Sequence, residues 1–549
     1  MKRVLAALVA LASLAFAATA SAGTWTFVGT NTQTWKPITG GGYPDPPGST
    51  KPIPGTCRTG VYNANRSESW IAVKPGTETL VGLSKIFFEK YSTFYNFHLG
   101  SYTIKNGAVT ASNQVQGYEC TTTGTQDMPP SWTNNTDPNV DFDTQGRAYQ
   151  TTLPFNAFWA GGLHPNGAID VSYSDDLGRH WVKGNGGQDL EPNNNQLSTT
   201  FGHVEDKQWI AVNHIVGNVN QDHVYSMWTT FNGAAGNGKI RVAVSRDRGR
   251  TFSKAITITP PGVTTPATTF VYPSIDAAGN VYVAFVGGFD TTNKNRVGHV
   301  YVTRSLDDGV TFGPFVEAAT PGENPNGFLP NTNFRDGIIE NFAASPTYPG
   351  HLYLTYEDWD ATTGQFDVKF KQSTDGGLTW GPELTVNDAP NSATTDQFQP
   401  SVAAGPGGAV AVAFYDRREA CPADPSILPQ HVGKANTCID VSLQAFKDSG
   451  AGAVPVGGNV RMSQFTWDPD QPQQKIDGIT QVACAGHNDP CPLGRAFIGD
   501  YFGLAISDGN VYTFSVSTHY PTSVKADDGG PVYYQQQILG TVARSVLGI

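Results

Sequence analysis

Three short segments carry the side chains best suited to chemistry, and each lies beside a predicted hairpin strand. Tyr501 stands in FIGDYFGL, Glu340 ends NFRDGIIE, and Asp416 precedes two arginines in FYDRRE. A guanidinium can bind a carboxylate through two parallel hydrogen bonds. A phenol has an unperturbed pKa of about 10, so it needs a neighbouring carboxylate to take its proton before it attacks. These residue types suit the binding of an acidic ligand and proton transfer beside it.

The elements that must position these side chains are short apolar strands. Pairs of such strands, joined by Gly or Asn turns, begin near residues 70, 140, 209, 272, 340, 399 and 501. A third strand of alternating character follows at 169–173, 240–244, 299–303, 366–370 and 439–443. Such runs bounded by turn residues are hairpin signals. Four antiparallel strands in about 60–70 residues are typical of one propeller blade.

A motif of the form S-x-D-x-G-x-T-[WF] follows four of the third strands. Its copies begin at residues 174, 245, 305 and 373, so the starts are 71, 60 and 68 residues apart, and the first copy has His180 in place of Thr. The Ser and Asp side chains can hold a tight turn through local hydrogen bonds, and the Gly suits a positive φ. The defining positions are Ser174, Asp176, Gly178, Trp181, Ser245, Asp247, Gly249, Phe252, Ser305, Asp307, Gly309, Phe312, Ser373, Asp375, Gly377 and Trp380.

This motif resembles the Asp box, or bacterial neuraminidase repeat, of sialidase-like β-propellers. The resemblance implies an all-β propeller of four-stranded antiparallel blades over residues 56–549, with a loop insert at about 446–497. The count of strand pairs favours seven blades, and the six blades of sialidases are the alternative. Residues 447–450 look like a fifth copy that has lost the motif. The copies themselves are expected to be structural.

The same resemblance suggests roles for the candidate residues. Sialidase-like enzymes use an arginine triad for the substrate carboxylate, an Asp acid/base, and a Tyr nucleophile assisted by a Glu. By position, Tyr501 would be the nucleophile and Glu340 its partner, with the following as substrate ligands: Arg335, Arg417, Arg418, Arg495 and Asp416. The alternatives are that Tyr501 packs in the channel wall and that the arginines form salt bridges between blades. The aromatic-Arg-Ile-Pro sequence of sialidases is missing, and acidic Glu357 and Asp358 stand where the family has arginine.

The N-terminus has the pattern of a secretory signal peptide. Lys2 and Arg3 precede an apolar run and the small residues that end at Ala22, so residues 1–22 would be removed on export. The Gly- and Pro-rich residues 23–55 are then an N-terminal extension, and no later run is long enough for a transmembrane helix. We therefore expect a monomeric protein outside the cytoplasm, either secreted or periplasmic.

Charge and cysteine content limit the partners and cofactors. Loss of Lys2 and Arg3 would change the formal net charge from −12 to −14, which argues against nucleic acid and is compatible with structural calcium. Six cysteines in an exported chain suggest disulfides, and sequence neighbours give 57–120, 421–438 and 484–491. No zinc, Walker or dinucleotide motif is present, so we expect no required cofactor.

Together these features predict a secreted propeller that acts on extracellular glycans or glycoproteins. An exo-α-sialidase type of glycoside hydrolase is the first hypothesis. The second is a non-catalytic propeller that binds carbohydrate or protein, and the third is a lyase or hydrolase for another acidic polysaccharide.

Overall fold

The computed structural model describes most of the chain. It covers residues 25–34, 65–87, 97–115, 134–156, 166–191, 203–232, 237–259, 268–290, 297–325, 329–332, 334, 336, 340–483 and 497–549. The predicted signal peptide, most of the extension, and the cysteines of the 57–120 and 484–491 pairs lie outside these residues.

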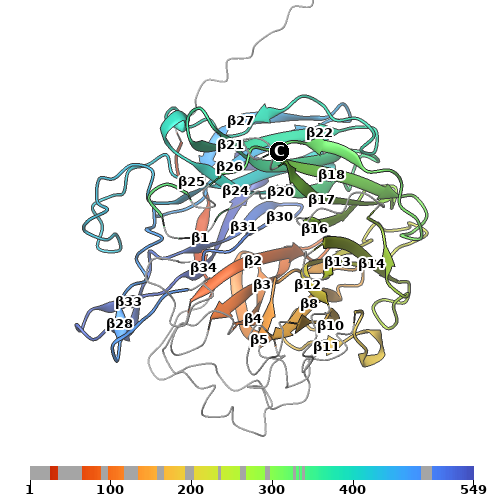
Figure 1. Ribbon diagram of the computed structural model, residues 1–549, viewed down its shortest axis with the longest axis horizontal. Helices are drawn as coiled ribbons and strands as arrows, with labels where there is room; N and C mark the ends of the chain where they lie inside the picture. Colours follow the sequence, from red (N-terminus) through yellow and green to blue (C-terminus); the bar gives the residue numbers. More distant parts are fainter. Residues whose placement is uncertain are drawn as a thin grey trace, which may run out of the picture.

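Seven antiparallel sheets, blades I to VII, form the body of the protein, as the strand pairs predict (Figure 1). The strands of blades I to IV, from inner to outer, are β2 (Arg66–Val73), β3 (Thr79–Phe87), β4 (Phe97–Lys105) and β5 (Ala108–Val115); β6 (Asn134–Thr136) with β7 (Asp141–Phe142), β8 (Ala148–Asn156), β9 (Asn166–Gly167) with β10 (Asp170–Ser174), and β11 (Val182–Lys183); β12 (His203–Val212), β13 (Val224–Asn232), β14 (Asn237–Ser245) and β15 (Ile256–Thr257); β16 (Thr268–Ile275), β17 (Val281–Asp290), β18 (Val297–Ser305) and β19 (Val316–Ala319).

The remaining three blades complete the ring. Their strands, in the same order, are β20 (Glu340–Ala344), β21 (Leu352–Asp360), β22 (Gln365–Ser373) and β23 (Leu384–Thr385); β24 (Gln397–Ala404), β25 (Ala409–Asp416), β26 (Asp440–Asp448) and β27 (Ala453–Arg461); β30 (Gly503–Ile506), β31 (Asn510–Ser517), β34 (Gln536–Ala543) and β1 (Thr30–Gln33). Helical structure among the described residues is short: η2 (Asn185–Gly187), η3 (Ser392–Thr394), η4 (Pro406–Gly408) and α1 (Arg544–Leu547). None of the described helices has the length and apolar character needed to cross a membrane.

Blade VII is closed by the N-terminal extension. Strand β1 pairs antiparallel with β34, from Thr30 opposite Thr541 to Gln33 opposite Ile538. The outermost strand of the last blade therefore comes from the other end of the chain, within the residues 23–55 that were expected to form an N-terminal extension. Because β1 precedes blade I in sequence, this pairing holds the first and last blades together.

The four motif copies adopt one turn with the same hydrogen bonds. In the copy that begins at Ser305, the Ser Oγ donates to Asp307 Oδ1 (2.8 Å) and accepts from Gly309 N (2.8 Å). Asp307 also accepts from the amide (2.9 Å) and the hydroxyl (2.6 Å) of Thr311. Gly309 has a φ of 76°, and a Cβ there would lie 2.8 Å from Val244 of blade III. Each turn thus ends the third strand of one blade and packs on its neighbour.

A second repeat, which the sequence analysis missed, joins tyrosines to carboxylates near the same turns. The second or third residue of the second strand is Tyr in five blades, and its hydroxyl donates to an acid. The pairs are Tyr149–Asp143 (2.8 Å), Tyr225–Asp308 (2.5 Å), Tyr282–Asp276 (3.1 Å), Tyr353–Asp448 (2.7 Å) and Tyr512–Glu78 (2.5 Å). The pairs with Asp308, Asp448 and Glu78 connect adjacent blades and so reinforce the ring.

The largest described loops lie within and between blades VI and VII. Residues 417–439 connect β25 to β26 and are closed by the Cys421–Cys438 disulfide, which confirms that predicted pair. Strands β28 (Lys475–Ile476) and β29 (Ile479–Thr480) form one small hairpin, and β32 (Pro521–Lys525) and β33 (Pro531–Tyr533) form another. The predicted insert at 446–497 includes β27, so its first part belongs to blade VI.

Candidate functional site

The inner strands surround a channel that aromatic side chains fill at mid-height. We call the end where the inner strands begin the upper end, and the end that carries the repeat turns the lower end. Trp209 of blade III contacts Trp70, Tyr272 and Tyr501, with ring centroids 4.6, 4.8 and 5.0 Å away. These four rings come from blades I, III, IV and VII. They join four of the seven blades through ring contacts.

Several of the inner strands contain a bulge just above these rings. The bulge residues are not glycine, yet they adopt positive φ: Glu68 (32°), Asp137 (56°), Lys207 (51°), Phe270 (55°) and Gln399 (45°). In blades I, III, IV and VI the strand register shifts at this residue. Such a conformation costs a Cβ-bearing residue on the order of 1–3 kcal/mol, and bulges of this kind re-aim side chains next to active sites. Because these strained residues recur at one level of the channel, we take this level as the candidate site.

Six charged side chains from four blades meet at this level. We call them the upper cluster: Glu68, Lys85, Asp137, Asp206, Lys207 and Asp500. Lys85 Nζ lies 2.6 Å from Glu68 and 3.8 Å from Asp137, and Lys207 Nζ lies 3.4 Å from Asp137 and 2.7 Å from Asp500. Asp137 therefore stands between two ammonium groups contributed by different blades.

Burial and these ion pairs give the carboxyl groups different proton affinities. Burial raises the pKa of Glu68 to about 7 although Lys85 opposes the rise, and burial raises the pKa of Asp206 to about 6 against the effect of Lys207. Burial would also raise the pKa of Asp137, but Lys207 and Lys85 bring it below its ordinary value. Glu68 and Asp137 are 0 % and 2 % exposed. Near neutral pH Glu68 is thus only partly ionised, while Asp137 beside it carries its charge.

A cavity of about 210 Å³ lies at the lower end of the channel. It is lined mainly by the apolar ends of the inner strands, and the titratable side chains in its wall are Asp141, His214 and Tyr272. The Asp141 carboxylate accepts from the amides of Phe142 (2.8 Å) and Val212 (2.8 Å). The Asp141 carboxylate is therefore occupied by backbone amides. The upper end of the channel has more charged side chains that a ligand could use.

The structure does not give Tyr501 the surroundings expected of a nucleophile. Its hydroxyl donates to the carbonyl oxygen of Pro138 (3.0 Å), not to a glutamate. Burial, with Glu68 and Asp137 nearby, raises the pKa of Tyr501 well above its usual range. Glu340 is fully buried. Its charge, together with burial, raises the pKa of Tyr272. The tyrosine beside Glu340 is Tyr272.

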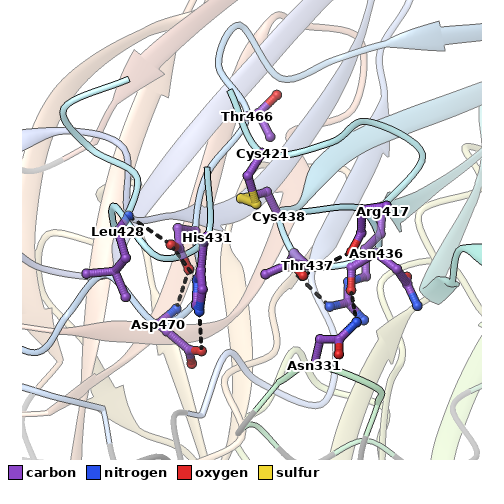
Figure 2. The surroundings of a disulfide bond; sticks show 12 residues. Asn331, Arg417, Cys421, Leu428, His431, Asn436, Thr437, Cys438, Thr466 and Asp470 are labelled. Carbon is purple, nitrogen blue, oxygen red and sulfur yellow. Dashed lines mark hydrogen bonds and ion pairs between the residues drawn. A yellow bond between two sulfur atoms is a disulfide. The ribbon is translucent and has the colours of Figure 1, made fainter. Parts of the chain in front are cut away.

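The candidate arginines that the structure describes are held by other acids. Arg417 is 0 % exposed; its guanidinium lies 3.1 Å from Asp396 and donates to backbone carbonyls, and Figure 2 shows it beside the 421–438 loop. Arg418 binds Asp416 (2.7 Å) and Asp388 (2.9 Å). Burial lowers the pKa of Arg417 to about 10 despite Asp396. Arg335 and Arg495, the other two, lie outside the described residues.

Sequence reasoning located the inner strands but missed the charged residues of the upper cluster. Two of these residues share a sequence pattern: a charged residue stands two positions before the tryptophan of an inner strand, as Glu68 does before Trp70 and Lys207 before Trp209. Strict strand alternation would place such residues on the aromatic's own face. The bulges change that relation, and they were not predicted.

Comparison with known proteins leaves the chain without a family assignment. No protein-family model and no curated protein matches it. Among solved structures, a protein of unknown function from Dyadobacter fermentans is similar at TM-score 0.43 and 13 % identity, covering 65 % of this chain and 91 % of the other. An α-L-arabinofuranosidase of Fusarium graminearum gives 0.38 and 12 %, covering 76 % and 94 %. The sialidase of Trypanosoma rangeli gives 0.38 and 10 %, covering 93 % and 59 %. These likenesses are too remote to assign an activity.

Proposed function

We propose that the chain acts on glycans at the upper end of its channel, as a glycoside hydrolase that uses Glu68 and Asp137. The observation that supports this proposal is a pair of buried carboxyl groups near the ammonium group of Lys85. The pKa of Glu68 is raised and the pKa of Asp137 is lowered. Two carboxyl groups whose pKa values are pushed apart are the arrangement that glycoside hydrolysis requires.

In this reaction Glu68 donates its proton to the glycosidic oxygen as the bond between that oxygen and the anomeric carbon breaks. The ionised Asp137 supports the positive charge that develops on the sugar ring, and Lys85 and Lys207 keep it ionised. Water supplies the hydroxyl group of the released sugar, and its proton returns to the site. Sugar hydroxyls can donate to the carboxylates and accept from the ammonium groups, so the cluster also suits binding.

A neutral sugar fits this site better than an acidic one. The upper cluster contains four carboxyl groups and two ammonium groups, and Arg417 and Arg418 are bound to Asp396 and Asp416. An anionic sugar would therefore meet net negative charge from these residues. The exo-sialidase hypothesis, in which Tyr501 attacks with help from Glu340, receives its support from the resemblance of the repeats to Asp boxes.

The second candidate is a carbohydrate-binding propeller without turnover, and the depth of the cluster favours it. Asp137 and Glu68 are almost completely buried, so a ligand could contact the cluster from above without reaching these carboxyls. Export through residues 1–22 belongs to both proposals, since extracellular glycans would be the substrates or ligands.

The test is a screen for released sugar on neutral glycosides, sialosides and acidic polysaccharides. The wild type is compared with Glu68→Gln, Asp137→Asn and Tyr501→Phe, and Glu317→Gln on outer strand β19 is the control. We expect release from a neutral glycoside that the first two variants lose by at least 100-fold, while Tyr501→Phe and the control retain it. Turnover that depends on Tyr501 and not on Glu68 would contradict the proposed chemistry. Binding without release by any variant would favour the second candidate.

A further inference from the structure

A histidine and two aspartates meet where two loops of the upper end touch. His431 belongs to the 417–439 loop, which the Cys421–Cys438 disulfide closes, and Asp468 and Asp470 follow β27. In Figure 2 the His431 ring points toward Asp470 beside this disulfide. The side chains of His431, Asp468 and Asp470 are 12 %, 0 % and 9 % exposed. This group is separate from the upper cluster and has no part in the proposed hydrolysis.

The contacts of Asp468 fix how the imidazole is oriented. Asp468 Oδ2 accepts from His431 Nδ1 (2.9 Å) and from the amide of Leu428 (3.1 Å), and Oδ1 accepts from the amide of Asp470 (3.0 Å). Because a carboxylate can only accept, Nδ1 carries the hydrogen in neutral His431. The lone pair is then on Nε2, the atom that faces Asp470.

The distance from His431 Nε2 to Asp470 Oδ2 is 4.0 Å. This is too long for a hydrogen bond. Two tetrahedral zinc ligands at about 2.0–2.2 Å from a shared ion lie about 3.3–3.6 Å apart, so a small side-chain rotation would bring these two atoms to that separation. One ligand atom from each of the three residues lies within 4.8 Å of those of the other two. A histidine that binds a metal almost always donates its other N–H to a carboxylate, a backbone carbonyl or water, and His431 donates to the buried Asp468.

We propose that His431 Nε2 and the Asp470 carboxylate bind a divalent transition metal, with zinc the best fit, and that Asp468 orients the histidine. Imidazole nitrogen with carboxylate oxygen is a donor set that such ions accept. The bound ion would connect the disulfide-closed loop to the segment after β27 at the upper end of blade VI. Water would complete the coordination.

The competing explanation is an ion pair, in which protonated His431 bridges the two aspartates. A simple histidine–carboxylate pair elsewhere in the chain provides the matched control. His299 Nδ1 lies 2.8 Å from Glu317 on blade IV, and its side chain is 31 % exposed. The ion-pair explanation predicts that zinc treats His431 and His299 alike, whereas the metal site predicts a difference.

The experiment is calorimetric titration of the full chain with zinc, after removal of bound metal with a chelator. The variants are His431→Gln, Asp470→Asn and Asp468→Asn, with His299→Gln as the control. We expect the wild type and His299→Gln to bind one more zinc ion per chain than His431→Gln and Asp470→Asn. Asp468→Asn should bind this ion 10- to 100-fold more weakly, as is typical of a lost orienting partner.

A second measurement needs no variant, so it guards against misfolding. Zinc should protect His431 of the wild type from modification by diethyl pyrocarbonate, read by peptide mapping, and should leave His299 as reactive as before. Equal zinc stoichiometry in the wild type and a folded His431→Gln variant would overturn the proposal. Modification of His431 at the same rate with and without saturating zinc would overturn it as well.

Discussion

Because folding raises the pKa of Glu68, the free energy of unfolding should fall as the pH rises and Glu68 loses its proton. The Glu68→Gln variant should lack this part of the pH dependence. Glu68 is fully buried on a left-handed bulge of β2, where burial raises its pKa from 4.5 to about 7. The folded state therefore holds the proton more tightly than the unfolded chain does. The stability that protonated Glu68 contributes is complete below about pH 4.5 and is lost as the pH rises through 7.

The size of the effect follows from the shift of the pKa. One pKa unit corresponds to about 1.4 kcal/mol, so a change from 4.5 to about 7 corresponds to roughly 3 kcal/mol. The free energy of unfolding of the wild type, minus that of Glu68→Gln, should fall by this amount between pH 4 and pH 8. Glutamine keeps the size of the side chain but has no proton to lose, so other titrating groups cancel in the difference.

Urea unfolding followed by tryptophan fluorescence at a series of pH values measures this difference. A second pair of variants tests the role of Lys85, whose ammonium lies 2.6 Å from Glu68 and opposes the rise in pKa. In the Lys85→Met background, the fall caused by Glu68 should move to higher pH. A difference curve that is flat, or that rises with pH, would refute the assignment of a protonated Glu68.

Three other perturbations test the architecture. Asp307→Ala and Asp375→Ala each remove the acceptor of a repeat turn and should lower the free energy of unfolding by about 1–3 kcal/mol without changing ligand binding; normal melting with lost binding would contradict the structural role. Deletion of residues 25–34 removes β1 from blade VII and should lower the melting temperature, measured by calorimetry, and an unchanged value would show that β1 does not close the ring. Replacing Cys421 and Cys438 by Ser opens a loop of sequence separation 17 and should cost about 3 kcal/mol in urea unfolding, whereas no loss would mean that the loop is held by its other contacts.

Local patterns in the sequence were enough to predict the blades. Strand pairs bounded by Gly and Asn turns gave the seven inner hairpins, and the repeated motif gave the turn after four of the third strands. The reason is that six of the blades are built entirely from neighbouring residues, and their hairpins and turns involve contacts over short separations; blade VII, whose strand β1 comes from the N-terminal extension, is the exception. The 421–438 disulfide was predicted for the same reason, since its loop is short.

The site was decided by contacts between distant parts of the chain. Lys207 meets Asp500 and Asp137 only because the ring brings blades II, III and VII to one axis, and the bulges that aim these side chains have no simple sequence pattern. The partner of Tyr501, which lies 363 positions away, could not be read from its neighbours in sequence for the same reason. Thus the sequence by itself determined the strands, the turns and the number of blades, because those depend on local hydrogen bonding and alternation. Only the tertiary structure decided which charges share the channel, because burial and ion pairing depend on residues of different blades, such as Lys207 and Asp500, which lie 293 positions apart.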